Sequence, residues 1–253
     1  MKFVRFLAVF LILFSSCGIE DYPFIYSIYT GYIQNEFNSR VIIYISDENQ
    51  GSAYFTNYTI FYRIYISDVD IASPSESDFM VINNVMYNDH SRIRPYIGND
   101  SMGSSSIDTL FRNMNYYPIS LEGADIGYIL SPGSSNPVFN KNLVIDFSRD
   151  SENVPYLTLG TGPRYNLLRA DGVAGNYQVL PGNRYFMNTQ ELLSEENISD
   201  TTINGDVTDK PNAEKRNTYV SMYIIASGVD PQTFVQLYSA PAHVGVLQLP
   251  NQY

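Results

Sequence analysis

The fold of this chain is decided by one ten-residue stretch, Asn57-Tyr58-Thr59-Ile60-Phe61-Tyr62-Arg63-Ile64-Tyr65-Ile66. Nearly all of its side chains are β-branched or aromatic, which suits the pleated surface of a sheet. Because side chains alternate along a strand, one face carries Tyr58, Ile60, Tyr62, Ile64 and Ile66, and the other carries Thr59, Phe61, Arg63 and Tyr65. We expect the first face to lie in the core and the second to be half exposed.

Other β-runs occur before and after this stretch, at residues 40–46, 124–130, 142–147, 218–226 and 243–249. The composition agrees, with 22 Tyr and 14 Phe but no Trp in 253 residues. Tyrosine and phenylalanine favour strands, where we expect them mainly as cross-strand pairs. The alternative is an aromatic binding face for sugars or protein partners. The sequence therefore predicts a mainly β protein, with the strands in an antiparallel β-sandwich.

Two segments depart from the β pattern. The start signal Ser73-Pro74-Ser75-Glu76 has a capping serine, a proline suited to the first helical position and a glutamate that completes a capping box. Apolar residues then recur at helical spacing, which predicts one short amphipathic helix over residues 74–88. Residues 194–217 form the most polar tract, and we expect a mobile loop there because it has little apolar surface to bury.

Two of the β-runs resemble parts of a fibronectin type III or immunoglobulin-like sandwich. The tyrosine-rich run Tyr58 to Ile66 resembles its third strand, and residues 218–249 resemble its last two strands. The resemblance implies an antiparallel sandwich. Because the two matches lie about 160 residues apart, the chain holds either one sandwich with long insertions or two units. We find no internal repeat, and we expect a single β-rich domain over residues 17–253.

The N-terminus has the layout of a secretory signal peptide. Lys2 and Arg5 precede an uncharged apolar run, Phe6 to Phe14, which leads through two serines into Cys17. The run is well short of the ~20 residues that a membrane-spanning helix needs. The sequence therefore predicts that residues 1–16 are an export signal.

The tetrad Phe14-Ser15-Ser16-Cys17 resembles a bacterial lipobox of the loose, spirochaete-like kind. The resemblance implies that the Cys17 thiol is acylated, as in bacterial lipoproteins, and becomes the first residue of the mature chain. Ordinary signal-peptidase cleavage and retention of the segment are the alternatives. Because Cys17 is the only cysteine, the mature chain has no internal disulfide. The implied location is the cell envelope, with the outer membrane or cell surface favoured over the inner membrane.

The chain is strongly acidic. Its 15 basic and 26 acidic residues give a net charge of −11, and removal of residues 1–16 with Lys2 and Arg5 brings it to −13. Nucleic-acid binding depends on clustered Lys and Arg that neutralise phosphates, so we expect no nucleic-acid partner. The same charge disfavours a polybasic membrane contact, which leaves the lipid as the expected membrane partner.

The sequence predicts no catalytic residues, no metal ligands and no cofactor. Only two histidines exist, His90 and His243, too few for a site built on several imidazoles, and we interpret His243 as a structural residue with its hydrogen bonds satisfied. Acidic turns at Asp47-Glu48 and Asp68-Val69-Asp70 are interpreted as solvated loops, with calcium binding as the alternative. The glycine-rich span 159–163 lacks the following helix of a phosphate cradle.

These observations favour a membrane-anchored lipoprotein with a non-enzymatic binding or adhesion role at the envelope. The expected partner is a protein or a glycan, and the residues that bind it are unknown at this stage. Two alternatives remain: an envelope enzyme that processes glycans with two loop carboxylates, and a structural component of the envelope.

Overall fold

A computed structural model describes residues 24–36, 39–72, 74–98, 105–148, 154–171, 178–179, 185–186, 203–204, 207–208 and 217–249. Its helical elements are 3-10 turns η1, η2 and η3 and helices α2 to α5. Their bounds are η1 Thr30–Tyr32, η2 Glu76–Asp78, α2 Phe79–Ile82, α3 Asn84–Ile93, η3 Arg94–Tyr96, α4 Ser105–Asn113 and α5 Ile126–Ile129. The helix expected as one piece over residues 74–88 is thus divided among η2, α2 and α3.

Strands make up most of the described elements. They are β1 Ile33–Glu36, β2 Arg40–Ile45, β3 Phe55–Ser67, β4 Tyr117–Pro118, β5 Ser120–Leu121, β6 Lys141–Asp146, β7 Tyr156–Leu159, β8 Tyr165–Leu168, β9 Ala170–Asp171, β10 Gln178–Val179, β11 Ile203–Asn204, β12 Val207–Thr208, β13 Asn217–Val229, β14 Gln236–Tyr238 and β15 Ala242–Leu249. The mainly β prediction is confirmed, and strands β2, β6, β13 and β15 lie where the sequence placed them.

Two large sheets, almost entirely antiparallel, organise these strands. One has the order β1-β2-β6-β7-β8-β5, and the other has the order β11-β12-β3-β13-β14, with β15 also paired to β13 and β4 to β3. The long strands β3 and β13 pair from Asn217 opposite Ser67 to Gly228 opposite Phe55. The stretch singled out in the sequence therefore lies at the centre of the second sheet.

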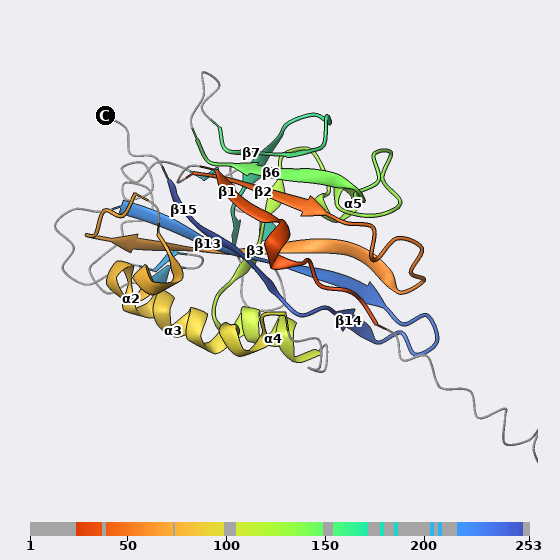
Figure 1. Cartoon of the computed structure of the whole chain (residues 1–253), viewed down its shortest axis with the longest axis horizontal. Helices are drawn as coiled ribbons and strands as arrows, with labels where there is room; N and C mark the ends of the chain where they lie inside the picture. Colours follow the sequence, from red (N-terminus) through yellow and green to blue (C-terminus); the bar gives the residue numbers. More distant parts are fainter. Residues whose placement is uncertain are drawn as a thin grey trace, which may run out of the picture.

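The molecule has three layers, two sheets and a layer of helices (Figure 1). Between the sheets lies the largest core cluster, which takes Val41 and Ile43 from β2, Ile145 from β6, and Ile60 and Tyr62 from β3. Helices α2, α3 and α4 cover the outer face of the β3–β13 sheet (Figure 1). Two smaller clusters fill the space between this face and the helices.

The prediction that the second face of β3 is half exposed is wrong. Phe61, Arg63 and Tyr65 are all buried, because the helical layer covers them. Phe61 stacks on Phe111 of α4 with ring centroids 4.9 Å apart. Tyr65 packs in a cluster with Phe79 of α2. A strand buried on both faces shows a continuous apolar and aromatic run, and this explains the composition of residues 57–66.

The predicted helix is broken at Asn83, whose backbone is extended with φ −162°. Its side-chain oxygen accepts hydrogen bonds from the backbone N–H groups of Val85 and Met86, so Asn83 caps α3. The capping box forms at Ser75 with Asp78. Ser73 lies outside the described residues. Helix α3 continues past the expected end at Asn88-Asp89 to Ile93, because the buried residues Asp89, His90 and Ile93 face the sheet.

Residues 124–130 were expected as a strand, and this prediction is also wrong. The segment forms the short helix α5, in which the Asp125 carboxylate accepts a hydrogen bond of 2.8 Å from the backbone N–H of Gly127. An aspartate at this position satisfies a free amide of the first turn and favours helix over strand.

Within the tract 194–217, where a mobile loop was expected, the structure describes 203–204, 207–208 and residue 217. Strand β12 pairs in parallel with β3, and its Thr208 is buried. Val207–Thr208 is therefore held against the sheet, and the expectation does not apply to it. The proposed export signal and Cys17 lie outside the described residues. In the described part of the chain, no helix is long and apolar enough to cross a membrane.

Candidate functional site

The two histidines of the chain come together although they lie far apart in the sequence. His90 is on α3 and His243 is on β15, and their ring centroids are 5.0 Å apart. Phe79 of α2 contacts both imidazoles edge-on, with centroid distances of 4.5 Å to His90 and 5.5 Å to His243. Tyr223 of β13 lies next to His243, at 4.8 Å. An aromatic and imidazole cluster thus forms where the sheet meets the helical layer.

A β-bulge places His243. Along the β13–β15 pair, Met222 lies opposite Gly245 and Tyr223 lies opposite His243, so Val244 is the extra residue. Gly245 has φ +134°, a conformation that side-chain-bearing residues rarely adopt. A Cβ added at Gly245 would lie 2.9 Å from the amide nitrogen of Asn35. Bulges re-aim side chains near functional sites, and here the bulge adjoins a pocket.

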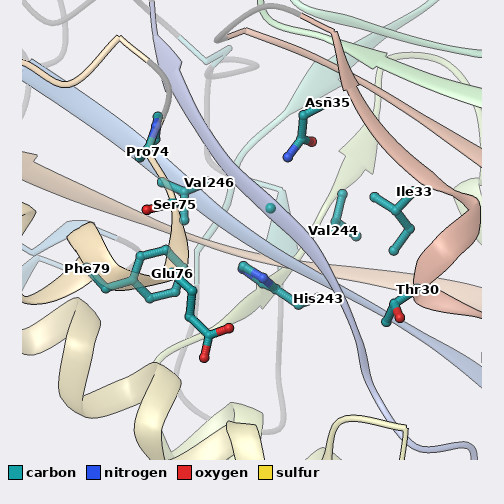
Figure 2. Close-up of a pocket in the computed structure, with 11 residues that line it drawn as sticks. Thr30, Ile33, Asn35, Pro74, Ser75, Glu76, Phe79, His243, Val244 and Val246 are labelled. Carbon is teal, nitrogen blue, oxygen red and sulfur yellow. The ribbon is translucent and has the colours of Figure 1, made fainter.

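The pocket has a volume of about 230 Å³ and opens beside the bulge (Figure 2). Figure 2 shows the ring of His243 and the amide of Asn35 on either side of the β15 strand that runs through the site. The lining residues come from η1, β1, the start of η2, α2 and β15. They are Thr30, Ile33, Asn35, Pro74, Ser75, Glu76, Phe79, His243, Val244, Gly245 and Val246. The lining combines a carboxylate, an amide, an imidazole and two hydroxyl groups.

Burial favours the neutral form of both imidazoles. Burial, with a smaller contribution from the neighbouring His90, lowers the pKa of His243 to about 3. Burial also lowers the pKa of His90, although Glu76 acts in the opposite direction. The Glu76 carboxylate lies 3.3 Å from Nε2 of His90, without hydrogen-bond alignment, and 2.9 Å from Nε of Arg94. The carboxylate is thus shared between a neutral ring and an exposed guanidinium.

The two imidazoles differ in their hydrogen bonds. Nδ1 of His90 lies 2.5 Å from the hydroxyl of Tyr223. Nε2 of His243 is buried and has no hydrogen-bond partner among the described residues, and Nε2 of His90 also makes no hydrogen bond, although Glu76 lies beside it. The interpretation of His243 as a satisfied structural residue is therefore wrong at this atom. A buried polar atom without a partner is costly.

Three exposed tyrosines lie around η1, which supplies Thr30 to the pocket. Tyr29, Tyr32 and Tyr44 have more than a third of their surface exposed. Tyr29 and Tyr32 meet edge to face at 5.2 Å, and Tyr32 and Tyr44 do so at 5.4 Å. The chain between the first two supplies Thr30 to the pocket, and Ile33 follows directly. We call Tyr29, Tyr32 and Tyr44 the tyrosine row. It was not identified from the sequence, where Tyr residues were expected mainly as cross-strand pairs.

The other candidates from the sequence do not join this site. In the acidic turn after β2, Asn49 exchanges two 2.9 Å hydrogen bonds with the backbone of Tyr26, so the turn anchors the N-terminal segment. The glycine-rich span 159–163 is followed by strand β8. Among the described residues, no group of three His, Cys, Asp or Glu side chains is arranged to hold a metal ion.

No family model, curated protein or solved structure matches this chain. The site must therefore be interpreted from its own geometry.

The bulge gives a direct test of how the pocket is built. We expect Gly245→Ala to lower the free energy of unfolding by roughly 2 kcal/mol, because alanine is strained at this φ and its Cβ would collide with Asn35. Urea denaturation measures the change. Gly133→Ala is the matched control, since its Cβ would meet its nearest neighbour at 3.9 Å. Equal stability of the two variants would show that Gly245 does not constrain the bulge.

Proposed function

We propose that this protein is a lipid-anchored protein of the bacterial envelope that binds a glycan, without catalysis, in the pocket beside His243. The observation that carries the proposal is the polar pocket, lined by Asn35, Glu76 and His243, next to the tyrosine row. The signal-peptide layout and the lipobox-like Cys17 support the envelope location.

A sugar fits both parts of this site. Its C–H face packs on an aromatic ring, which the tyrosine row offers, and its hydroxyl groups pair with polar side chains. Around the pocket these are the Asn35 amide, the Ser75 hydroxyl, the Glu76 carboxylate and the His243 imidazole. The volume of about 230 Å³ is smaller than a drug-sized pocket and suits a single sugar unit. The acidic chain repels anionic polymers, so we infer that the glycan is neutral.

Binding is favoured over hydrolysis by the carboxylates of the site. Glycosidases use two carboxyl groups that flank the scissile bond, about 5 to 10 Å apart. The described residues that line the pocket include one carboxylate, Glu76, and Arg94 pairs with it. A paired carboxylate holds its charge and serves as a hydrogen-bond acceptor.

We further propose that the sandwich is of the fibronectin type III or immunoglobulin-like type. In immunoglobulin-like domains the first, second and fifth strands share one sheet, and the third, sixth and seventh share the other. Here β1, β2 and β6 are neighbours in one sheet, and β3, β13 and β15 are neighbours in the other. Helices α2 to α4 and strands β7 to β12 would then be insertions in one unit.

Glycan binding is tested by calorimetry with neutral hexose and N-acetylhexosamine oligosaccharides. We expect Tyr32→Ala to weaken binding about tenfold, because loss of one aromatic packing partner costs about 1 to 1.5 kcal/mol. Tyr128→Ala is the control, since Tyr128 is also half exposed but lies on α5, which supplies no residue to the pocket, whereas Tyr32 lies on η1, which supplies Thr30.

Three results would contradict the proposal. They are the absence of binding to all of these oligosaccharides, equal weakening by both variants, and release of shortened sugars. The last would favour the glycan-processing enzyme.

A further inference from the structure

The turn between β13 and β14 is closely held. The backbone N–H of Asp230 donates to the carbonyl of Val235, and the N–H of Phe234 donates to the carbonyl of Asp230. The Asp230 carboxylate accepts hydrogen bonds from the backbone N–H of Gln232 at 2.9 Å and from the Thr233 hydroxyl at 2.5 Å. The conformation of the turn is therefore fixed by its own residues.

This turn exposes an aromatic side chain on a strained backbone. Phe234 has 81% of its surface exposed, and its backbone has φ +58°, where a bulky residue is a genuine outlier. Val235 beside it is 52% exposed. A strained backbone persists when the surrounding structure over-determines it, and such strain gathers at functional positions. An exposed, strained Phe next to an exposed Val indicates a surface that is covered when the protein works.

A second exposed aromatic pair lies at the same end of the sheet. Phe24 and Tyr26 are about half exposed, and their rings meet at 4.8 Å. Ile25 between them packs at Gly228, since a Cβ added there would lie 2.5 Å from Ile25 Cδ1. Gly228 pairs with Leu237 of β14, so this segment adjoins the turn. In Figure 1 the first described residues, in red, run beside β14 at the end where the turn lies.

The two segments also lack charge. Residues 24–32 contain no ionisable group other than tyrosine, and in residues 230–238 the only carboxylate is that of Asp230, which is occupied within the turn. The chain as a whole has a net charge of −11, so two neighbouring segments without a free charge are unusual on its surface. Tyrosine is enriched at the water interface of lipid bilayers, and phenylalanine is found on the apolar face of segments that lie in this interface.

We propose that this end of the molecule, formed by Phe24, Tyr26, Phe234 and Val235, rests in the interfacial layer of a lipid bilayer. The inference rests on the proposed acylation of Cys17. Six residues separate Cys17 from Phe24, and seven extended residues span at most about 25 Å. The bilayer that holds the acyl chain therefore lies within reach of Phe24. The exposed apolar and aromatic side chains of the two segments face it, and the acidic turn Asp47-Glu48, which Asn49 joins to Tyr26, stays in water.

The absence of tryptophan allows a direct test. The Phe234→Trp variant carries a single tryptophan, and the acylated protein is reconstituted in phosphatidylcholine vesicles with brominated acyl chains. We expect its emission to lie further to the blue in vesicles than in the vesicle-free protein. In brominated vesicles the emission should be at least twofold weaker than in unbrominated vesicles. Met80→Trp is the matched control. Met80 is exposed on α2, which packs near Tyr219, about 33 Å along β13 from the turn, and its emission should not change.

The mass of the N-terminal peptide separates the possible failures. An acylated protein whose Phe234→Trp variant is not quenched would overturn this inference and leave the lipid anchor standing. An unmodified Cys17 would overturn both the lipid anchor and this inference. Self-association of a Cys17→Ala variant in solution that is lost on Phe234→Ser would assign the surface to a second copy of the chain, and this too would overturn the inference.

Discussion

Replacement of Asp89 by alanine is expected to lower the free energy of unfolding by about 3 kcal/mol, because it leaves the buried guanidinium of Arg63 without its carboxylate. Arg63 lies in the middle of β3 and is 2% exposed. Its Nη1 donates to Oδ2 of Asp89 at 2.7 Å. Removal of one partner of a buried ion pair is far more costly than removal of an exposed one.

The pair belongs to a wider network that joins the layers. Arg63 also donates to the hydroxyl of Thr208 on β12, at 2.6 Å and 3.1 Å, and to the carbonyl of Met114. The Tyr65 hydroxyl donates to Asp89 at 2.6 Å and lies 3.1 Å from the hydroxyl of Tyr116. Burial raises the pKa of Asp89 although Arg63 lowers it, so desolvation outweighs attraction. We infer that the network fixes how α3 and β12 sit on the sheet more than it adds stability.

A double-mutant cycle measures how much the pair of Asp89 and Arg63 contributes to stability. Chemical denaturation of Asp89→Ala, Arg63→Met and the double variant gives the coupling between the two side chains. We expect the double variant to be more stable than Asp89→Ala alone, because no unpaired charge remains buried. Asp89→Asn is the conservative control, since it keeps the shape of the side chain. A loss below about 1 kcal/mol in Asp89→Ala would show that water or the remaining partners satisfy Arg63.

The central strands could be predicted because their signal is local. The run at residues 57–66 is continuous, and a strand buried on both faces needs such a run. The sequence nevertheless suggested a half-exposed second face, which is the face that carries Arg63. Its burial depends on Asp89, 26 residues further along the chain, which no local pattern reveals. The error at α5 has a different origin, since Asp125 caps a helix in a segment that otherwise resembles a strand.

The candidate site could not be predicted, because its parts meet only in the folded chain. His90 and His243 belong to different layers, and a bulge in β15 aims one at the other. The glycine at position 245 was a weak signal, since an isolated glycine in a strand often marks a bulge. Exposure of the tyrosine row likewise follows from the fold, since Tyr29 and Tyr32 lie at η1 and Tyr44 is the exposed residue of β2. The sequence shows that the chain contains the residue types of a glycan site, but it does not show that they come together.

The stability of the protein is expected to depend on pH through His243. The unfolded chain binds a proton at this residue below about pH 6.5. The folded chain does so only near pH 3, because burial and the neighbouring His90 lower the pKa of His243 to about 3. Between these values the unfolded state carries more protons, so stability falls as the pH falls, by up to about 1.4 kcal/mol per pH unit. The lowered pKa of His90 acts in the same direction.

Urea denaturation at pH 7 and pH 4.5 tests this against His243→Phe, which keeps a ring beside Phe79 and Tyr223 but cannot titrate. We expect the wild-type protein to lose at least 2 kcal/mol more than the variant between these pH values. If the wild-type protein and the variant lose the same free energy of unfolding, His243 takes up a proton in the folded state as easily as in the unfolded state. Glu76 and the other carboxylates would then account for the response to acid. The expected result would mean that Nε2 of His243 stays a neutral hydrogen-bonding atom down to mildly acidic pH. Glycan binding by the wild-type protein should then persist at pH 5, where an exposed histidine would already be charged.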